Sequence, residues 1–398
     1  METLKYIKEY TLKSKDIPLL DFRFSSFKNE NFKNIEKLEI LKIYKDFSKL
    51  RPLDLENDID SLEKFIKNRR IPNNRENFDK IINTLPYENR NLLTSYIDIS
   101  LALSLNDSYW LVPKNSKFLW KDYNLYNNNF SKLISETAFF GIEHSIKMLT
   151  TSPEYTTNGA IKKCWYRYDN GKTVLFKSNS VEYANRGKEA YTEFYTGQVA
   201  KYFDFDYVKY DLVNYKGNIV SACDIFTSEK ISYVPIFKVL DKKDNNNLEK
   251  INEIMGYDFM ADMLVFDSLI GNIDRHLGNF GLLRNNDTGE ILRPAPIFDN
   301  GLSFINLISS FELDRKDLSK YYFSNYKDSF LEGFESIVYK YVNEKHLKIF
   351  EKLKDFKIEK HSKYNLDDKW LKAFENFVRE NAKMFINIYM IKKEKYVK

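Results

Sequence analysis

The sequence predicts an α+β protein in which a strand-rich middle lies between two helix-rich ends. Glycine is absent before Gly141 and after Gly333. Glycine and proline mark changes of chain direction, so the scarcity of glycine predicts helices at both ends. Between them, runs of alternating apolar and polar residues meet at glycine-containing turns. We expect a mainly helical N-terminal region at 1–149, a β-rich part at 150–228 and a helical part at 229–398.

The composition indicates a folded protein without a strong preference for nucleic acid. The 398 residues are 43% hydrophobic and 16% aromatic, and the formal net charge is only +5. So balanced a charge argues against nucleic acid as the main partner. Cys164 and Cys223 give neither a disulfide framework nor a metal-binding spacing. Because no signal sequence or membrane span is predicted, we expect a cytoplasmic protein.

Two segments of the N-terminal region have helical patterns. The segment NIEKLEILKIYKDFSKL places Ile35, Leu38, Leu41 and Ile43 on one roughly helical stripe. The segment IDSLEKFIKNRRIP predicts a second helix that ends before Pro72. Apolar stripes of this kind most often face a protein core.

The middle of the chain has the pattern of two strand pairs around a helix. Alternation on both sides of Asn170-Gly171 predicts a hairpin, because Asn-Gly suits turns that need positive φ. The segment GKEAYTEFYTGQVAKYFDF predicts a helix, and a second strand pair is expected to turn at Lys216-Gly217. Near the C-terminus, WLKAFENFVRENAKMFINIY predicts a helix with one apolar face.

The segment DSLIGNIDRHLGNFGLL, residues 267–283, is the strongest chemical signal. An apolar helix is expected to stop at Gly271, and a polar loop follows with Asp274 and, five residues later, Asn279. This interval is close to that between the base and the metal-binding Asn of kinase catalytic loops. Asp299 follows in PIFDNGLSF, where a short strand is expected to enter a turn. The two oxygen-bearing side chains suit Mg²⁺, which also keeps several waters.

Phosphoryl transfer from ATP also needs a lysine at the phosphates and an acid that fixes this lysine. Lys177 ends the second hairpin strand on the same face as Leu175, where a buried amine is costly unless it meets an anion. The expected partner is Glu193 on the following helix, and Glu189, one turn earlier, is the alternative. The plain structural interpretation is a strand-end lysine in water.

The segment TTNGAIKK, which begins at Thr156, is a candidate phosphate loop. Gly159 would let backbone N–H groups approach phosphate oxygens and Lys163 would offset their charge, although an ordinary loop is the alternative. His276 is expected to shape the catalytic loop by hydrogen bonding, because four histidines without ligand spacing do not indicate a metal site. Arg275 either contacts phosphate or substrate, or braces the loop through an ion pair.

At these residues the sequence resembles the HipA-like serine/threonine kinases, over about residues 150–310. The resemblance implies a bilobed, protein-kinase-like fold with a small β-rich N-lobe and a helical C-lobe. It implies that Asp274 is the catalytic aspartate, that Asn279 and Asp299 bind Mg²⁺, and that Lys177 binds the phosphates of ATP.

The resemblance also assigns residues at the two ends of the nucleotide. Adenine would stack near Asp224, Ile225 and Phe226. Thr156 takes the place of the residue that this family can phosphorylate on itself, and Thr157 is a substitute.

The function implied is an ATP- and Mg²⁺-dependent serine/threonine protein kinase, in the setting of a toxin–antitoxin system. Well-known members have a β-rich N-terminal subdomain and pair with a DNA-binding antitoxin, whereas residues 1–140 here look helical. Operator binding is therefore not carried over, and an antitoxin is retained only as a candidate partner beside an unidentified protein substrate. The alternatives are a kinase of a lipid or small molecule, and a nucleotide-binding interaction module with little turnover.

Overall fold

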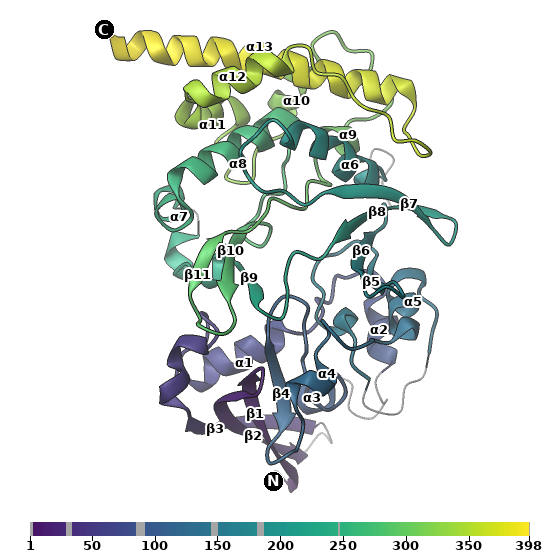
Figure 1. Ribbon diagram of the computed structural model, residues 1–398, viewed down its shortest axis with the longest axis vertical. Helices are drawn as coiled ribbons and strands as arrows, with labels where there is room; N and C mark the ends of the chain where they lie inside the picture. Colours follow the sequence, from purple (N-terminus) through teal and green to yellow (C-terminus); the bar gives the residue numbers. More distant parts are fainter. Residues whose placement is uncertain are drawn as a thin grey trace. The chain divides into compact units, whose positions relative to one another are not determined.

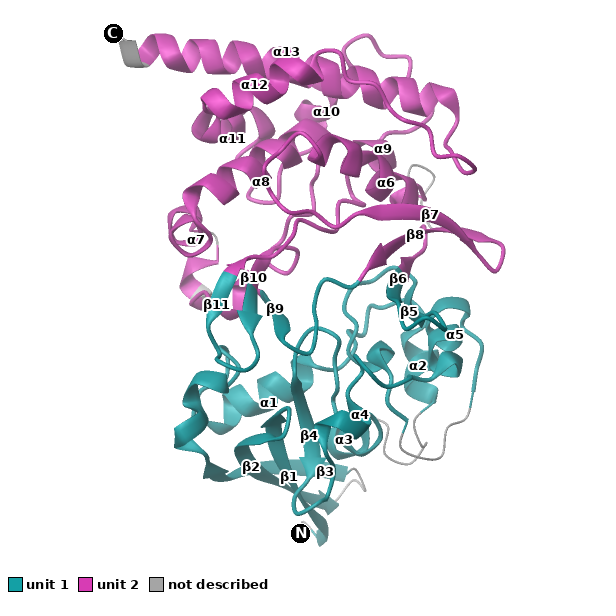
Figure 2. Cartoon of the chain, in the orientation of Figure 1, with its two compact units in different colours: residues 1–175, 225–234, 283–292 teal, residues 176–224, 235–282, 293–398 magenta. Residues whose placement is uncertain are grey.

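The computed structural model describes the chain as two compact units (Figure 2). None of the helices in the described part of the chain is long and apolar enough to cross a membrane. The described residues are 3–28, 34–84, 92–144, 150–180, 187–245 and 247–397. Unit 1 comprises residues 1–175, 225–234 and 283–292, and unit 2 comprises residues 176–224, 235–282 and 293–398.

Unit 1 combines β-sheets with short helices (Figure 1). Its strands are β1 (Thr3–Ser14), β2 (Ile17–Lys28), β3 (Asn34–Ile43), β4 (Tyr109–Pro113) and β5 (Lys163–Arg167), and parts of β6 (Thr173–Lys177), β9 (Ile231–Pro235), β10 (Gly281–Asn285) and β11 (Ile291–Pro294). Its helices are η1 (Lys45–Leu50), α1 (Ile59–Asn68), α2 (Phe78–Asn83), α3 (Leu93–Ser100), α4 (Trp120–Tyr123), α5 (Lys132–Phe140) and η3 (Pro153–Tyr155).

The first sheet of unit 1 has the strand order β3-β2-β1-β4 and is antiparallel wherever these strands pair. The segment NIEKLEILKI forms strand β3 and not the predicted helix, because less and more exposed residues alternate along most of it. Leu38 pairs with Phe24 and Ile40 with Phe22, while Ile35 is 37% exposed. The gain from pairing with β2 outweighs the helical propensity of the intervening Glu and Lys residues. The expectation of a mainly helical N-terminal region is therefore wrong.

The scarcity of glycine led to the wrong prediction of helices, because residues other than glycine form the turns in this region. Lys15, at the β1–β2 turn, has φ +50°, and Asn77, Leu101 and Ala102 also adopt positive φ. These conformations normally favour glycine, so their cost must be met by the packing around them. By contrast, helix α1 is capped by Asp58, whose side chain accepts a hydrogen bond from Ser61 N, and the helix ends before Pro72 as predicted.

Unit 2 is mainly helical, apart from parts of β6, β9, β10 and β11 and the antiparallel strands β7 (Tyr210–Tyr215) and β8 (Asn218–Asp224). The predicted hairpins, the helix before β7 and the C-terminal helix are all confirmed. Sheet order is β5-β6-β8-β7, with β5 and the start of β6 in unit 1 and the rest in unit 2. The elements of unit 2 are α6 (Glu189–Ala200), β7 (Tyr210–Tyr215), β8 (Asn218–Asp224), η4 (Ile236–Lys238), η5 (Lys242–Asp244), α7 (Leu248–Met255), α8 (Tyr257–Ile270), α9 (Phe304–Leu307), α10 (Leu318–Asn325), α11 (Phe334–Tyr341), α12 (Glu344–Leu353) and α13 (Asp368–Val397).

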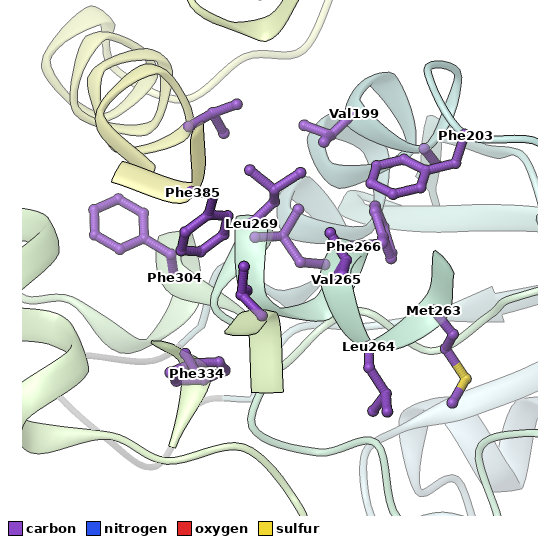
Figure 3. Close-up of a cluster of buried hydrophobic side chains, with 14 of the residues drawn as sticks. Val199, Phe203, Met263, Leu264, Val265, Phe266, Leu269, Phe304, Phe334 and Phe385 are labelled. Atoms are coloured by element: carbon purple, nitrogen blue, oxygen red, sulfur yellow. The ribbon is translucent and has the colours of Figure 1, made fainter. Parts of the chain in front are cut away.

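The core of unit 2 is built around helix α8 (Figure 3). Phe266 and Leu269 are fully buried and belong to one cluster with Val199 of α6 and Phe385 of α13. These large aromatic and aliphatic side chains make this a closely packed part of the unit. Helix α8 stops at Gly271, with φ +66°, where a Cβ would lie 2.7 Å from the ring of Tyr322. The polar loop that follows is thus anchored to a packed core.

Candidate active site

Lys177, at the end of β6, is the centre of a charged cluster in unit 2. Its Nζ lies 2.6 Å from Glu193 Oε1 and 2.6 Å from Asp299 Oδ1. Glu193 is therefore its partner on α6, as expected. Glu189 instead accepts hydrogen bonds from the backbone N, at 3.0 Å, and the hydroxyl of Ser180. Lys177 is thus a half-buried amine that meets anions rather than a strand-end lysine in water.

The charges in this cluster do not balance. Burial lowers the pKa of Lys177, but the carboxylates of Asp299 and Glu193 outweigh it and raise this pKa well above its usual value. Burial also raises the pKa of Glu193, and the charge of Asp299 adds to this rise. The same two causes raise the pKa of Asp274, burial first and Asp299 second. Two carboxylates at one amine, with the charge of Asp299 also acting on Asp274, favour the approach of a cation.

Asp299 is held in an unusual conformation. Its φ is +59°, and its backbone N donates to the hydroxyl of Tyr210 at 3.2 Å. The Nζ of Lys177 lies 5.5 Å from the centre of the Tyr210 ring. Positive φ is uncommon outside glycine and is often found at functional sites. The strand expected before Asp299 is reduced to a single parallel bridge between Ile297 and Tyr207.

The catalytic-loop candidate is shaped by its own hydrogen bonds. The backbone N of Asp274 donates to Asn272 Oδ1 at 3.0 Å, and Asn279 Nδ2 donates to Asp274 O at 2.9 Å. His276 is exposed, and its Nδ1 accepts a hydrogen bond from Gly278 N at 3.0 Å. This contact agrees with the expected role of His276 in shaping the loop.

Arg275 braces two loops, which decides between the two interpretations of this residue. Its guanidinium is almost fully buried and contacts both carboxylate oxygens of Asp267 on α8, each at 2.9 Å. Its Nη1 also donates to Asn279 O at 3.0 Å and to Phe298 O at 2.5 Å, and its Nη2 to Asn300 Oδ1 at 2.6 Å. One side chain therefore ties the loop of Asp274 to the loop of Asp299.

Asn279 and Asp299 are the residues predicted to hold a magnesium ion. The amide nitrogen of Asn279 is engaged with Asp274 O, which leaves its Oδ1 as the end that can coordinate a cation. Asp299 supplies carboxylate oxygens in a cluster with excess negative charge. The described residues contain no group of three or more His, Cys, Asp or Glu side chains that could hold a metal. Two ligands are enough for Mg²⁺ when phosphates and water complete its shell.

The candidate phosphate loop lies in unit 1. Gly159 has φ +96°, and a Cβ there would lie 2.1 Å from Lys163 Nζ, so the amine rests against the glycine backbone. Thr156 is buried, and its hydroxyl donates to Leu103 O at 3.0 Å. The hydroxyl of Thr157 donates to Pro153 O at 2.7 Å. Phosphorylation of either threonine would therefore require the loop to change shape.

The three residues expected near adenine divide between the units. Asp224 ends β8 in unit 2, whereas Ile225 and Phe226 belong to unit 1. Ile225 packs against the cluster around Trp110, and Phe226 meets the ring of Tyr233 edge to face, with centroids 5.6 Å apart. Their contact with adenine stays a prediction.

Sequence reasoning missed three residues that support the cluster. Tyr210 and Asn300 contact Asp299 N and Arg275, respectively, and Asn300 N also donates to Glu193 Oε2 at 3.0 Å. The role of Asp267 could have been predicted from the sequence, because a carboxylate within the apolar run MLVFDSLI needs a buried cation as its partner. Tyr210 gave no comparable signal, since tyrosine is common in this chain.

Comparisons with known proteins agree with the resemblance found in the motifs. No family model matches the sequence. A serine/threonine-protein kinase, CtkA of Helicobacter pylori, is 36% identical over 107 residues, which are 23% of this chain and 33% of that protein. The chain thus matches about a third of the length of this curated relative.

Two solved structures are also similar. The proinflammatory kinase CtkA of Helicobacter pylori gives a TM-score of 0.48 at 18% identity, over 60% of this chain and 93% of that chain. HipA of Shewanella oneidensis MR-1, solved with HipB and operator DNA, gives a TM-score of 0.49 at 12% identity, over 96% of this chain and 99% of that chain. The chain is an α+β protein that is similar in part of its sequence to the serine/threonine kinase CtkA.

Proposed function

We propose that this chain is an ATP- and Mg²⁺-dependent phosphotransferase that transfers the γ-phosphate to a protein hydroxyl. The observation that carries the proposal is the cluster in which Lys177 meets Glu193 and Asp299, while Arg275 ties the Asp299 loop to the loop of Asp274. Phosphoryl transfer depends mainly on positioning and on neutralisation of charge, which such a cluster is suited to provide. The sequence match to a serine/threonine kinase supports the same class.

Each residue has a role in this proposal. Lys177 binds the phosphates, and Glu193 holds its amine in place. Asn279 and Asp299 hold Mg²⁺, which would neutralise charge on the phosphates. Asp274 accepts the proton of the incoming hydroxyl, and its raised pKa brings it closer to the basicity this task needs.

The surrounding assignments are part of the same proposal. The loop from Thr156 to Lys163 would cover the phosphates, and adenine would lie near Ile225. Residues 150–228 would form the nucleotide-binding lobe and residues 229–398 the catalytic lobe. A toxin–antitoxin setting, with an antitoxin as partner, follows from the sequence resemblance.

The direct test compares the wild type with Asp274→Asn in transfer of labelled γ-phosphate from ATP, with Mg²⁺. Loss of the base should lower transfer by about 10²- to 10⁴-fold, while ATP affinity changes little. Wild-type-like transfer by the variant would refute the role of Asp274.

Transfer to lipids or sugars instead of proteins would favour a small-molecule kinase, and ATP binding without transfer would favour an interaction module. Peptide mapping of any autophosphorylation is expected to find Thr156 or Thr157.

A further inference from the structure

Arg75 and Glu154 form a fully buried ion pair in unit 1 that the proposed roles above do not use. Arg75 Nη2 lies 2.5 Å from Glu154 Oε2, and both side chains are 0% exposed. Removing two charges from water is expensive unless hydrogen bonds satisfy their remaining groups. The partners of Arg75 therefore indicate what this pair does in the unit.

Those partners are backbone carbonyls at both ends of the candidate phosphate loop. Arg75 Nη1 donates to Glu154 O and to Thr157 O, each at 2.9 Å. Its Nη2 donates to Lys163 O at 3.0 Å. Because the guanidinium is planar and rigid, one group sets the separation of the two loop ends.

The neighbouring residue supports the middle of the same loop. The backbone N of Glu76 donates to Ala160 O at 2.8 Å, and its carboxylate lies 2.9 Å from Lys162 Nζ. On the other side of the buried pair, Glu154 Oε1 accepts from Trp165 N at 2.7 Å. Start, middle and end of the loop are thus fastened to one short segment of the chain.

We propose that Arg75 is a positioning residue for the phosphate loop. Its bonds to Thr157 O and Lys163 O hold the loop in the curve where Lys163 Nζ rests against Gly159. A loop already held in one shape loses less conformational freedom when it meets phosphate oxygens. The inference rests on the proposed function, because it takes this loop to bind the phosphates of ATP.

The informative variant is Arg75→Lys. It keeps a positive charge beside Glu154, but a single amine cannot reach the carbonyls at both loop ends. The dissociation constants of ATP and of adenosine are measured by calorimetry with Mg²⁺. Adenosine lacks phosphates, so a loop defect should weaken ATP by about five- to tenfold and leave adenosine unchanged. General destabilisation would affect both ligands alike.

Arg69→Lys is the matched control. Arg69 is also a buried arginine in unit 1, with Asp107 Oδ2 at 2.8 Å and the carbonyls of Ala102 and Tyr109 as partners. None of these bonds reaches the phosphate loop. The ratio of ATP affinity to adenosine affinity should therefore stay at the wild-type value in Arg69→Lys.

The possible outcomes are distinct. A changed ratio in Arg75→Lys alone supports the inference. An unchanged ratio in Arg75→Lys, or an equal change in both variants, overturns it while leaving the proposed function standing. If the wild type binds adenosine and ATP equally well, or binds neither, the proposed function fails first and the inference fails with it.

Discussion

Two charged clusters, one in each unit, differ in the balance of their charges. In unit 1, Arg75 meets one carboxylate, that of Glu154, and its other contacts are neutral carbonyls. In unit 2, Lys177 meets two carboxylates and a third, Asp274, has its pKa raised partly by the charge of Asp299. A balanced pair stabilises the fold around it, whereas excess buried charge costs free energy unless a ligand compensates it.

Unit 2 contains both types side by side. Arg275 and Asp267 are a balanced, buried pair next to the unbalanced cluster of Lys177. From this contrast we infer that Arg275 and Asp267 hold the site in shape, and we propose that the cluster of Lys177 is kept for a ligand. We therefore expect substitutions at the balanced pairs to cause large losses of stability, and substitutions within the cluster of Lys177 to cause small ones.

The largest effect on stability is expected for Arg275→Gln. The change leaves Asp267 buried without a charged partner, which should cost about 3–5 kcal/mol in the free energy of unfolding. Chemical denaturation measures it, with Arg315→Gln as control, because the Arg315–Asp317 pair is exposed and its loss should not be measurable. Equal stability of the two variants would remove the argument that Arg275 is a brace.

A smaller, pH-dependent effect is expected at Asp262, which accepts from Lys345 at 2.6 Å and pairs with His346 at 3.0 Å. Although burial raises the pKa of Asp262, the hydrogen bonds from His346 and Lys345 outweigh it and lower this pKa. At neutral pH, Asp262→Asn should lose about 1–3 kcal/mol in the free energy of unfolding. The stabilisation is present above the usual pKa of aspartate and is lost as pH falls through the lowered value.

Glu193 should show the opposite sign, since its pKa is raised by burial and by Asp299. Relative to Glu193→Gln, the wild type should gain stability as pH falls from the raised pKa towards the ordinary one. Unfolding curves at several pH values test both residues together. The same sign at Asp262 and Glu193 would contradict the contrast between balanced and unbalanced charge.

The smallest effect on stability is expected for Asp299→Asn. The variant loses an ion pair with Lys177, but it also removes repulsion towards Glu193 and Asp274. The net change in the free energy of unfolding should stay within about 1 kcal/mol, since Asp299 is partly exposed. Thermal unfolding would show it, and a loss as large as that of Arg275→Gln would make Asp299 a structural residue.

The elements with local signals were predictable from sequence, and those fixed by distant partners were not. The hairpin at Asn170-Gly171 and the stop of α8 at Gly271 depend on backbone conformations that glycine favours, so the sequence shows them directly. Strand β3 has residues compatible with a helix, and its pairing with β2 decides its structure. Turns such as that at Lys15 left no glycine to detect.

The residues of the candidate site also divide into those with a local sequence signal and those fixed by distant partners. Lys177, Asp274, Asn279 and Asp299 stood out because polar residues followed apolar runs at a characteristic spacing. The role of Arg75 could not be inferred, because its partners lie about eighty residues further along the chain. The β-rich N-terminal sheet also removes the reason for setting this chain apart from the well-known members of the family it resembles.

We propose that Asp299, with Asn279, is kept for magnesium and nucleotide. Calorimetry of ATP binding to the wild type and to Asp299→Asn, each with Mg²⁺ and with a chelator, tests it most directly. The account predicts that Mg²⁺ raises ATP affinity of the wild type by about tenfold or more, and that the folded variant loses this gain. ATP affinity that ignores both Mg²⁺ and the substitution would contradict it.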